Sequence, residues 1–164
     1  MALDDSFRQF MDRFQIPDFT QLDWKHSTDK LRQQFHVASR AIERDAPEMA
    51  DITLLKVAGA TGSLKARIYT PLGAGLPPGP GIVFFHGGGF MLGDLDSHDM
   101  ICKRLAEGAR CRVIAVDYRL APEHAFPAAH EDALAAWTWI VANAPKLGLD
   151  PERLAVSGDS AGGN

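Results

Sequence analysis

The chain has 164 residues, of which 46% are hydrophobic and 23% are charged, and its formal net charge at pH 7 is -4. These values are close to the average of globular domains, so they exclude a disordered chain and a fibrous repeat. The sequence has no cluster of lysine and arginine, which excludes the charge pattern of proteins that bind nucleic acid or anionic membranes. A small neutral or apolar molecule is therefore the expected kind of partner.

Neither the cysteines nor the amino-terminal residues point to secretion, to a metal or to a membrane. Cys102 and Cys111 are too few for a disulfide framework, and their spacing matches no zinc motif. The first residues carry acidic side chains and lack the apolar run of a secretory signal. No stretch approaches the ~20 apolar residues of a membrane span. The sequence therefore predicts a cytoplasmic protein without a metal site.

Residues 1–45 have the periodicity of two amphipathic helices. Apolar side chains recur at intervals of three and four residues in both segments. They are Phe7, Phe10, Met11 and Phe14 in the first segment, and Leu31, Phe35, Ala38 and Ile42 in the second. We expect this helical segment either to pack as ordinary core or to cover a pocket. Residues 46–164 are expected to form the domain on which it lies.

From residue 51 the pattern changes to strands. Residues 52–57 and 63–70 are rich in strand-forming side chains and flank Gly59 and Gly62, so they predict a hairpin-like pair. Residues 71–80 are rich in glycine and proline and are expected to form a loop.

Apolar runs and helical patterns alternate along the rest of the chain. The apolar runs lie at 81–86, 112–118 and 154–157, and the helical patterns lie at 99–109 and 128–143. This alternation predicts the α/β class, with a mostly parallel sheet covered by helices on both faces. A ligand site is expected at the carboxyl ends of the strands.

The first apolar run ends in a glycine-rich turn. His86 is followed by Gly87, Gly88 and Gly89, and three consecutive glycines persist where the backbone must approach another group closely. Such a turn can present bare N–H groups to the negative charge that develops when an acyl carbonyl is attacked. The turn is therefore a candidate oxyanion hole.

The third apolar run leads into Gly158-Asp159-Ser160-Ala161-Gly162, the G-x-S-x-G pattern of a nucleophile elbow. The two glycines remove side chains that would crowd a sharp strand-to-helix turn. The serine hydroxyl is then exposed at the top of the sheet, and the N–H of Ala161 can donate to the same oxyanion.

The glycine loop also allows a second interpretation, a dinucleotide-binding turn. Gly87, Gly89 and Gly93 follow one strand and Asp117 ends the next, which loosely matches the dinucleotide fingerprint. The loop continues into an acidic stretch and does not open a helix at once. A pyrophosphate would therefore meet carboxylates where it needs amide donors, which disfavours this alternative.

Three motifs together resemble the hormone-sensitive lipase family, the bacterial family IV carboxylesterases with the α/β-hydrolase fold. They are HGGGF at 86–90, VDYRLAPEHAFPAA at 116–129 and GDSAGGN at 158–164. The resemblance is close over residues 80–164, and the amino-terminal helices more loosely resemble that family's cap. It implies hydrolysis of small carboxylic esters with short to medium acyl chains through a serine acyl-enzyme, and neither a metal nor an organic cofactor.

The same resemblance implies roles for residues of both turns. Ser160 would be the nucleophile, and the N–H groups of Gly88, Gly89 and Ala161 would form the oxyanion hole. His86 would brace the glycine loop and would not be the catalytic base.

Other residues would support this site from outside it. Gly87 would support the same loop, and Asp159 would sit beside the nucleophile with its side chain turned away from that of the serine. The stretch after the second apolar run would form a folded support under the site, with Arg119 and Glu123 paired by charge.

In α/β-hydrolases the catalytic acid and histidine follow the serine along the chain, so both are expected beyond Asn164. No upstream histidine fits this order, and His98 is expected only as a side chain at the start of a helix. The chain is therefore expected to be roughly the first half of an enzyme, with residues 46–164 as the amino-terminal half of its catalytic domain. Its expected partner is the carboxyl-terminal remainder of the same protein, and a homodimer remains open.

A binding protein on the same scaffold is the alternative to an enzyme. The hormone-sensitive lipase family also resembles the plant gibberellin receptors, which keep the fold and lose hydrolysis through the histidine position. A non-catalytic small-molecule receptor therefore stays open at this point, because the deciding histidine is not in this sequence.

Overall fold

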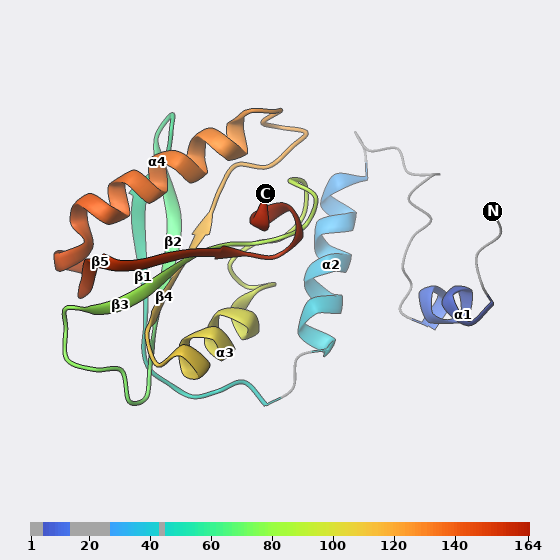
Figure 1. The fold of residues 1–164 in the computed structure, drawn as a ribbon. Helices are drawn as coiled ribbons and strands as arrows, with labels where there is room; N and C mark the ends of the chain where they lie inside the picture. Colours follow the sequence, from blue (N-terminus) through green and yellow to red (C-terminus); the bar gives the residue numbers. More distant parts are fainter. Residues whose placement is uncertain (1–4, 14–26, 43–44) are drawn as a thin grey trace.

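The computed structural model describes residues 5–13, 27–42 and 45–164 (Figure 1). None of the helices in these ranges has both the length and the apolar character needed to cross a bilayer. The elements in chain order are α1 (Asp5–Arg13), α2 (Thr28–Ile42), β1 (Met49–Ala58), β2 (Ser63–Pro71), β3 (Gly79–Phe85), α3 (Asp99–Ala109), β4 (Arg112–Asp117), α4 (Ala128–Asn143), the 3-10 turn η2 (Ala144–Leu147), β5 (Leu149–Gly158) and the 3-10 turn η3 (Ser160–Gly163).

The five strands form one mixed sheet in the order β1-β2-β4-β3-β5. The three strands expected from the apolar runs pair in parallel, with Val83 of β3 opposite Ile114 of β4 and Val156 of β5. The expected hairpin is also present, and it adds antiparallel pairings between β1 and β2 and between β2 and β4. The α/β class is confirmed, and the parallel character belongs to the half of the sheet that carries the two glycine-rich turns.

Alternate residues of the central strands face opposite layers. In β3, Val83 and Phe85 belong to the core under α4, whereas Phe84 belongs to the core over α3. Figure 1 shows α4 on one side of the sheet and α3 on the other. Cys102 of α3 is fully buried in the second core. The centre of the sheet is therefore covered on both faces, which is why β3 and β4 are largely apolar along their length.

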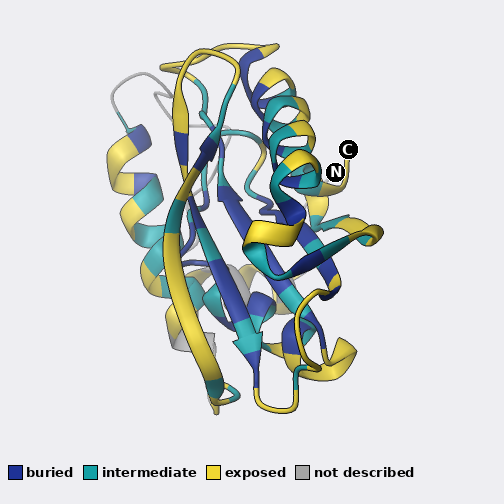
Figure 2. Ribbon diagram, turned by 90° about the vertical axis from the view of Figure 1, so that its left-hand side faces the viewer, coloured by how far each residue is buried: buried dark blue, intermediate teal, exposed yellow. Residues whose placement is uncertain are grey.

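The two outer strands are much more exposed than the inner ones (Figure 2). Leu54 of β1 is 70% exposed and Val156 of β5 is 56% exposed. Within the described part of the chain, β5 pairs only with β3, so one edge of this strand carries no ladder bonds. The polar groups of a sheet edge favour pairing with a further strand, and β5 is the edge next to the predicted elbow.

The two helices expected in the amino-terminal segment are confirmed as α1 and α2. In α2, Leu31 is buried and Phe35 is partly buried, in agreement with the predicted stripe. Phe14 of the first stripe lies outside the described residues. Figure 1 shows α2 beside the loops at one end of the sheet, whereas α1 lies away from the sheet.

A buried carboxylate joins α4 to the loop after β4. Asp132 is fully buried and accepts hydrogen bonds from the backbone N–H groups of Ala60 (2.9 Å) and Arg119 (3.1 Å) and from Nε of Arg119 (2.7 Å). Burial by itself would raise the pKa of Asp132, but these bonds outweigh that effect and hold the pKa below its ordinary value. Folding therefore stabilises the ionised form of the Asp132 carboxylate.

The expected pairing of Arg119 with Glu123 is wrong. Arg119 binds Asp132, and Glu123 instead pairs with Arg32 of α2 at 2.8 Å. Side chains four residues apart face each other in a helix, but residues 119–123 form a turn outside any helix. Arg119 and Glu123 therefore pair with residues of different helices, α4 and α2.

Asp132→Asn should destabilise the fold. The amide would place its own donor among N–H groups that already need an acceptor, and an unsatisfied buried polar group costs about 1–3 kcal/mol. Urea unfolding followed by tryptophan fluorescence should show this loss. The control is Asp150→Asn, which removes a partly exposed carboxylate paired with the exposed Arg153 three residues away. Equal midpoints for the two variants would contradict the role assigned to the buried carboxylate.

Candidate active site

The two glycine-rich turns meet at the carboxyl ends of the neighbouring strands β3 and β5. The backbone N–H of Gly87 donates to Oδ1 of Asp159 at 2.8 Å. A Cβ atom on Gly87 would lie less than 3.0 Å from that carboxylate, and one on Gly162 would lie less than 3.0 Å from the carbonyl oxygens of Phe85 and His86. Side chains at these positions would separate the turns, so glycine is what allows the close approach.

Ser160 lies at the apex of a sharp turn between β5 and η3. Its φ of 48° is in the left-handed region, which a non-glycine residue rarely occupies and which costs about 1–3 kcal/mol. The residue is exposed, and behind it the N–H of Gly162 closes the turn on the carbonyl of Asp159 at 2.8 Å. A Cβ on Gly158 would collide with the backbone of Gly162. This is the local geometry that the G-x-S-x-G pattern predicts.

The turn after β3 is held by two hydrogen bonds to the carbonyl of Gly88. Gly88 and Gly89 have φ values of 121° and 63°, and the carbonyl of Gly88 accepts the N–H groups of Met91 (3.1 Å) and Leu92 (2.9 Å). Among the described residues, none accepts a hydrogen bond from the backbone N–H of Gly88, Gly89 or Ala161. These three donors are thus available to a ligand.

His86 lies beneath this turn, with a side chain that is 2% exposed. Its Nδ1 donates to the carbonyl of Gly87 at 2.8 Å, because a carbonyl oxygen can only accept. Tyr118 stacks on the imidazole at 4.4 Å between ring centroids and donates its hydroxyl proton to the His86 carbonyl. Burial lowers the pKa of His86 to about 4. The ring is therefore neutral at pH 7, and its packing fits the expected bracing role.

His98 joins the two turns from the start of α3, which sequence reasoning missed. It occupies the position before α3 but makes no capping hydrogen bond with its side chain. Instead its Nε2 lies 3.4 Å from Oδ1 of Asp159, and its ring lies 5.4 Å from that of His86. Positions 98 and 159 are too far apart in sequence for any local pattern to reveal this contact.

A cavity of about 600 Å³ lies between α4 and β5, next to the elbow. Its walls combine apolar and polar groups and include Phe90, Tyr118, Trp137 and Val156, together with residues 161–164. Ser160 is not part of its lining. The cavity therefore lies beside the elbow and does not include the serine.

The described residues contain no cluster of metal-ligating side chains, and the glycine turn lacks the geometry of a dinucleotide site. In residues 5–13, 27–42 and 45–164, no three side chains of His, Cys, Asp and Glu gather as metal ligands. The glycine turn does not open a helix, since α3 begins only at Asp99. A pyrophosphate at Gly88 would therefore lack the amide donors of a helix amino terminus.

The fold and the two turns are those of an α/β hydrolase, and comparison with known proteins supports this class. Residues 82–164 match the family described by the alpha/beta hydrolase fold. The chain is 48% identical over 136 residues to a carboxylic ester hydrolase, LipN, of Mycobacterium tuberculosis. The aligned stretch covers 78% of this chain and 36% of the relative. It is 45% identical over 140 residues to an ethyl acetate hydrolase of Pseudomonas putida, and this alignment covers 83% of this chain and 43% of the relative.

Solved structures agree. An α/β hydrolase from the metagenome of Lake Arreo superposes with a TM-score of 0.85 at 39% identity, covering 96% of this chain and 48% of the other. A hyperthermophilic esterase of Pyrobaculum calidifontis gives a TM-score of 0.82 at 38% identity, covering 99% of this chain and 51% of the esterase. The chain spans half or less of the length of most of these relatives. It belongs to the α/β-hydrolase fold family, as the motifs predicted.

Gly162→Ala should destabilise the elbow. The new methyl group would be forced against the carbonyls of Phe85 and His86, and overpacking of this kind costs about 1–3 kcal/mol. Gly62→Ala is the matched control, because a Cβ there would meet nothing within 4 Å. Urea unfolding of both variants measures the difference. An unchanged midpoint for Gly162→Ala would show that the two turns can separate without cost.

His86 should stay neutral down to about pH 4. Its pKa is lowered on folding, so between about pH 4 and 6.5 the unfolded chain binds more protons. The stability that His86 contributes is therefore complete above pH 6.5 and is lost as the pH falls toward 4. Imidazole nitrogen shifts measured by NMR should show an Nδ1–H tautomer at pH 7. A titration midpoint near 6.5 would contradict the burial argument.

Proposed function

We propose that the protein carrying this chain hydrolyses small carboxylic esters through an acyl-enzyme on Ser160. The observation that carries the proposal is an exposed serine at positive φ, held at a strand end against a turn with unbonded N–H groups. A strained backbone at a reactive side chain is a common mark of catalytic sites. The named relatives, a carboxylic ester hydrolase and an ethyl acetate hydrolase, support the same chemistry.

In the proposed reaction the Oγ of Ser160 attacks the ester carbonyl carbon and gives its proton to a general base. The carbonyl oxygen becomes an oxyanion, which the N–H groups of Gly88, Gly89 and Ala161 stabilise. The alcohol then leaves with the proton returned by the base, and water hydrolyses the acyl-enzyme by the same route.

His86 is unsuited to be this base. Its Nδ1–H is bound to the Gly87 carbonyl, and its Nε2, the nitrogen left to accept a proton, is buried with no hydrogen-bond partner among the described residues. Its low pKa also makes it a weak base. In this fold the acid and the histidine follow the serine along the chain, so we assign the base to a histidine downstream of Ser160.

The substrates we propose are esters with short to medium acyl chains. The relatives named above act on carboxylic esters and on ethyl acetate, and the net charge of -4 favours neutral substrates over anionic ones. The amino-terminal segment, residues 1–45, is proposed to cover the acyl site. Its helix α2 supports this role, because Arg32 of α2 binds the loop that follows the glycine turn.

Ser160→Ala should abolish nearly all hydrolysis of p-nitrophenyl butyrate. Loss of the nucleophile in a serine hydrolase lowers kcat by up to about 10⁶-fold. The matched control is Ser63→Ala at the exposed first position of β2, which should keep wild-type kcat and KM. Both variants are compared at equal concentration after thermal unfolding has shown that they are folded. Residual activity of Ser160→Ala near that of the wild type would refute the proposal.

A further inference from the structure

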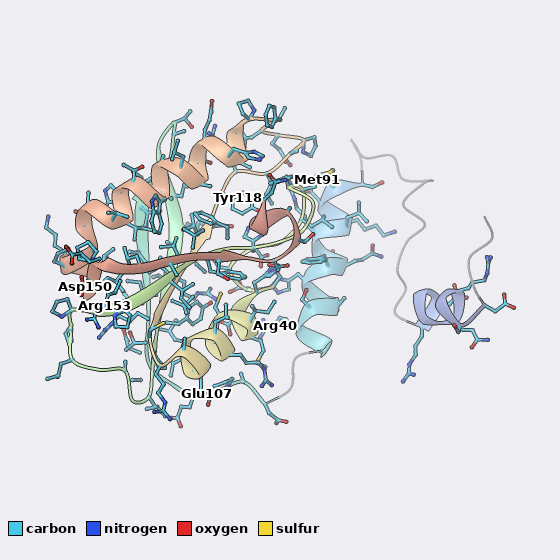
Figure 3. The ribbon with its side chains drawn as sticks, in the orientation of Figure 1. Arg40, Met91, Glu107, Tyr118, Asp150 and Arg153 are labelled. Carbon is cyan, nitrogen blue, oxygen red and sulfur yellow. The ribbon has the colours of Figure 1, made fainter. Side chains whose placement is uncertain are left out.

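Arg32 makes four hydrogen bonds that join α2 to two loops of the catalytic domain. Its Nη1 and Nη2 donate to both carboxylate oxygens of Glu123, each at 2.8 Å. Its Nε donates to the carbonyl of Met91 at 2.8 Å, and Nη2 also donates to the carbonyl of Ala121 at 2.9 Å. Figure 3 shows Met91 beside α2. The side chain is 28% exposed, so this contact is partly shielded from solvent.

The Met91 carbonyl connects Arg32 to the glycine turn. Met91 and Leu92 donate their own N–H groups to the carbonyl of Gly88. A peptide unit has a fixed plane, so holding the carbonyl of Gly88 in this direction also fixes the N–H of Gly89, which belongs to the same unit. Arg32 thereby acts on the orientation of a proposed oxyanion donor through one intervening residue.

The loop after β4, which contains Ala121 and Glu123, also binds the glycine turn. The N–H of Ala121 donates to the carbonyl of Phe90 at 2.8 Å, while the carbonyl of Ala121 accepts from Arg32. The turn is therefore held at Phe90 and at Met91 by two bonds that both depend on the position of the guanidinium. A rigid attachment of this kind suits a group that must stay in place during a reaction.

The contact requires the shape of an arginine side chain. Four bonds to three acceptor residues need the planar fork of the guanidinium, whereas an ammonium group is a compact charge that cannot reach all of them in one plane. The hydrogen bond from Arg32 lowers the pKa of Glu123 to about 2. Glu123 is therefore ionised throughout the working range of an esterase.

We infer that Arg32 is a positioning residue for the oxyanion hole, holding the Gly88–Gly89 peptide through Met91 and Ala121. The inference rests on the proposed function. It adds that α2 of the amino-terminal segment takes part in organising the turn on which turnover depends, in addition to covering the site.

The test compares Arg32→Lys with Arg40→Lys in the full-length protein. Arg40 is an exposed arginine toward the other end of the same helix (Figure 3). Arg32→Lys should lower kcat by about 10- to 100-fold, because small misplacements of catalytic groups have effects of this size. KM should change less than about twofold, because an oxyanion bond is made mainly in the transition state. Arg40→Lys should match the wild type.

Two further readouts separate positioning from loss of folded protein. A fluorophosphonate titration counts reactive serines, so kcat is expressed per active site. The inhibition constant of a trifluoromethyl ketone, which mimics the tetrahedral intermediate, should rise in parallel with the fall in kcat/KM. If Arg32→Lys is poorly folded, Glu123→Gln takes its place and should give a smaller change in the same direction. Unchanged kcat per site and unchanged inhibition in the folded variants would overturn the inference.

Hydrogen exchange distinguishes this inference from the proposed function. Amides of residues 88–92 should exchange faster in Arg32→Lys than in Arg40→Lys, whether or not the protein is an esterase. A wild type as inactive as Ser160→Ala would refute the proposed function alone. Equal exchange rates in the two lysine variants would refute the positioning role of Arg32 even in an active enzyme.

Discussion

The close approach of two backbone turns is the constraint on which the rest of this site depends. Strands β3 and β5 are parallel neighbours, so their carboxyl ends lie at the same edge of the sheet. The turns that follow the two strands are therefore packed tightly against each other. A Cβ atom at position 87, 158 or 162 would lie less than 3.0 Å from neighbouring atoms, so only glycine fits at these positions. The bond from Gly87 to Asp159 holds the two turns together and places Ser160 at the exposed apex.

Beneath the turns, a few polar side chains lie against the apolar core of the sheet. The Tyr118 ring stacks on His86 and its hydroxyl donates to the His86 carbonyl, while His98 lies beside the His86 ring with its Nε2 3.4 Å from Oδ1 of the partly exposed Asp159. Hydrogen bonds are directional, so these contacts specify one geometry more sharply than apolar packing does, although Nε2 of His86 is buried with no hydrogen-bond partner among the described residues. A site that must hold backbone donors in fixed directions gains from such specification, because donors that are already in place need no rearrangement during the reaction.

The amino-terminal segment is attached to this site by polar contacts as well as by its apolar stripe. Arg32 reaches both loops, and His36 lies 3.3 Å from Asp94 in the stretch between the glycine turn and α3. Such contacts are directional, whereas apolar packing is not. The same helix therefore provides cover and sets the position of the loop beneath it, and Phe35 lies beside His98 at 6.0 Å between ring centroids.

The sequence by itself determined what is local: the apolar runs that became β3, β4 and β5, the bounds of α3 and α4, and the two glycine-rich turns with their serine. Periodicity and turn chemistry depend on neighbouring residues, so they can be read from one chain. Only the tertiary structure decided the order of the strands and the partners of each charge, because residues distant in sequence meet only once the layers have packed. The contacts fixed in this way are Arg32 with Glu123, Arg119 with Asp132, and His98 with Asp159.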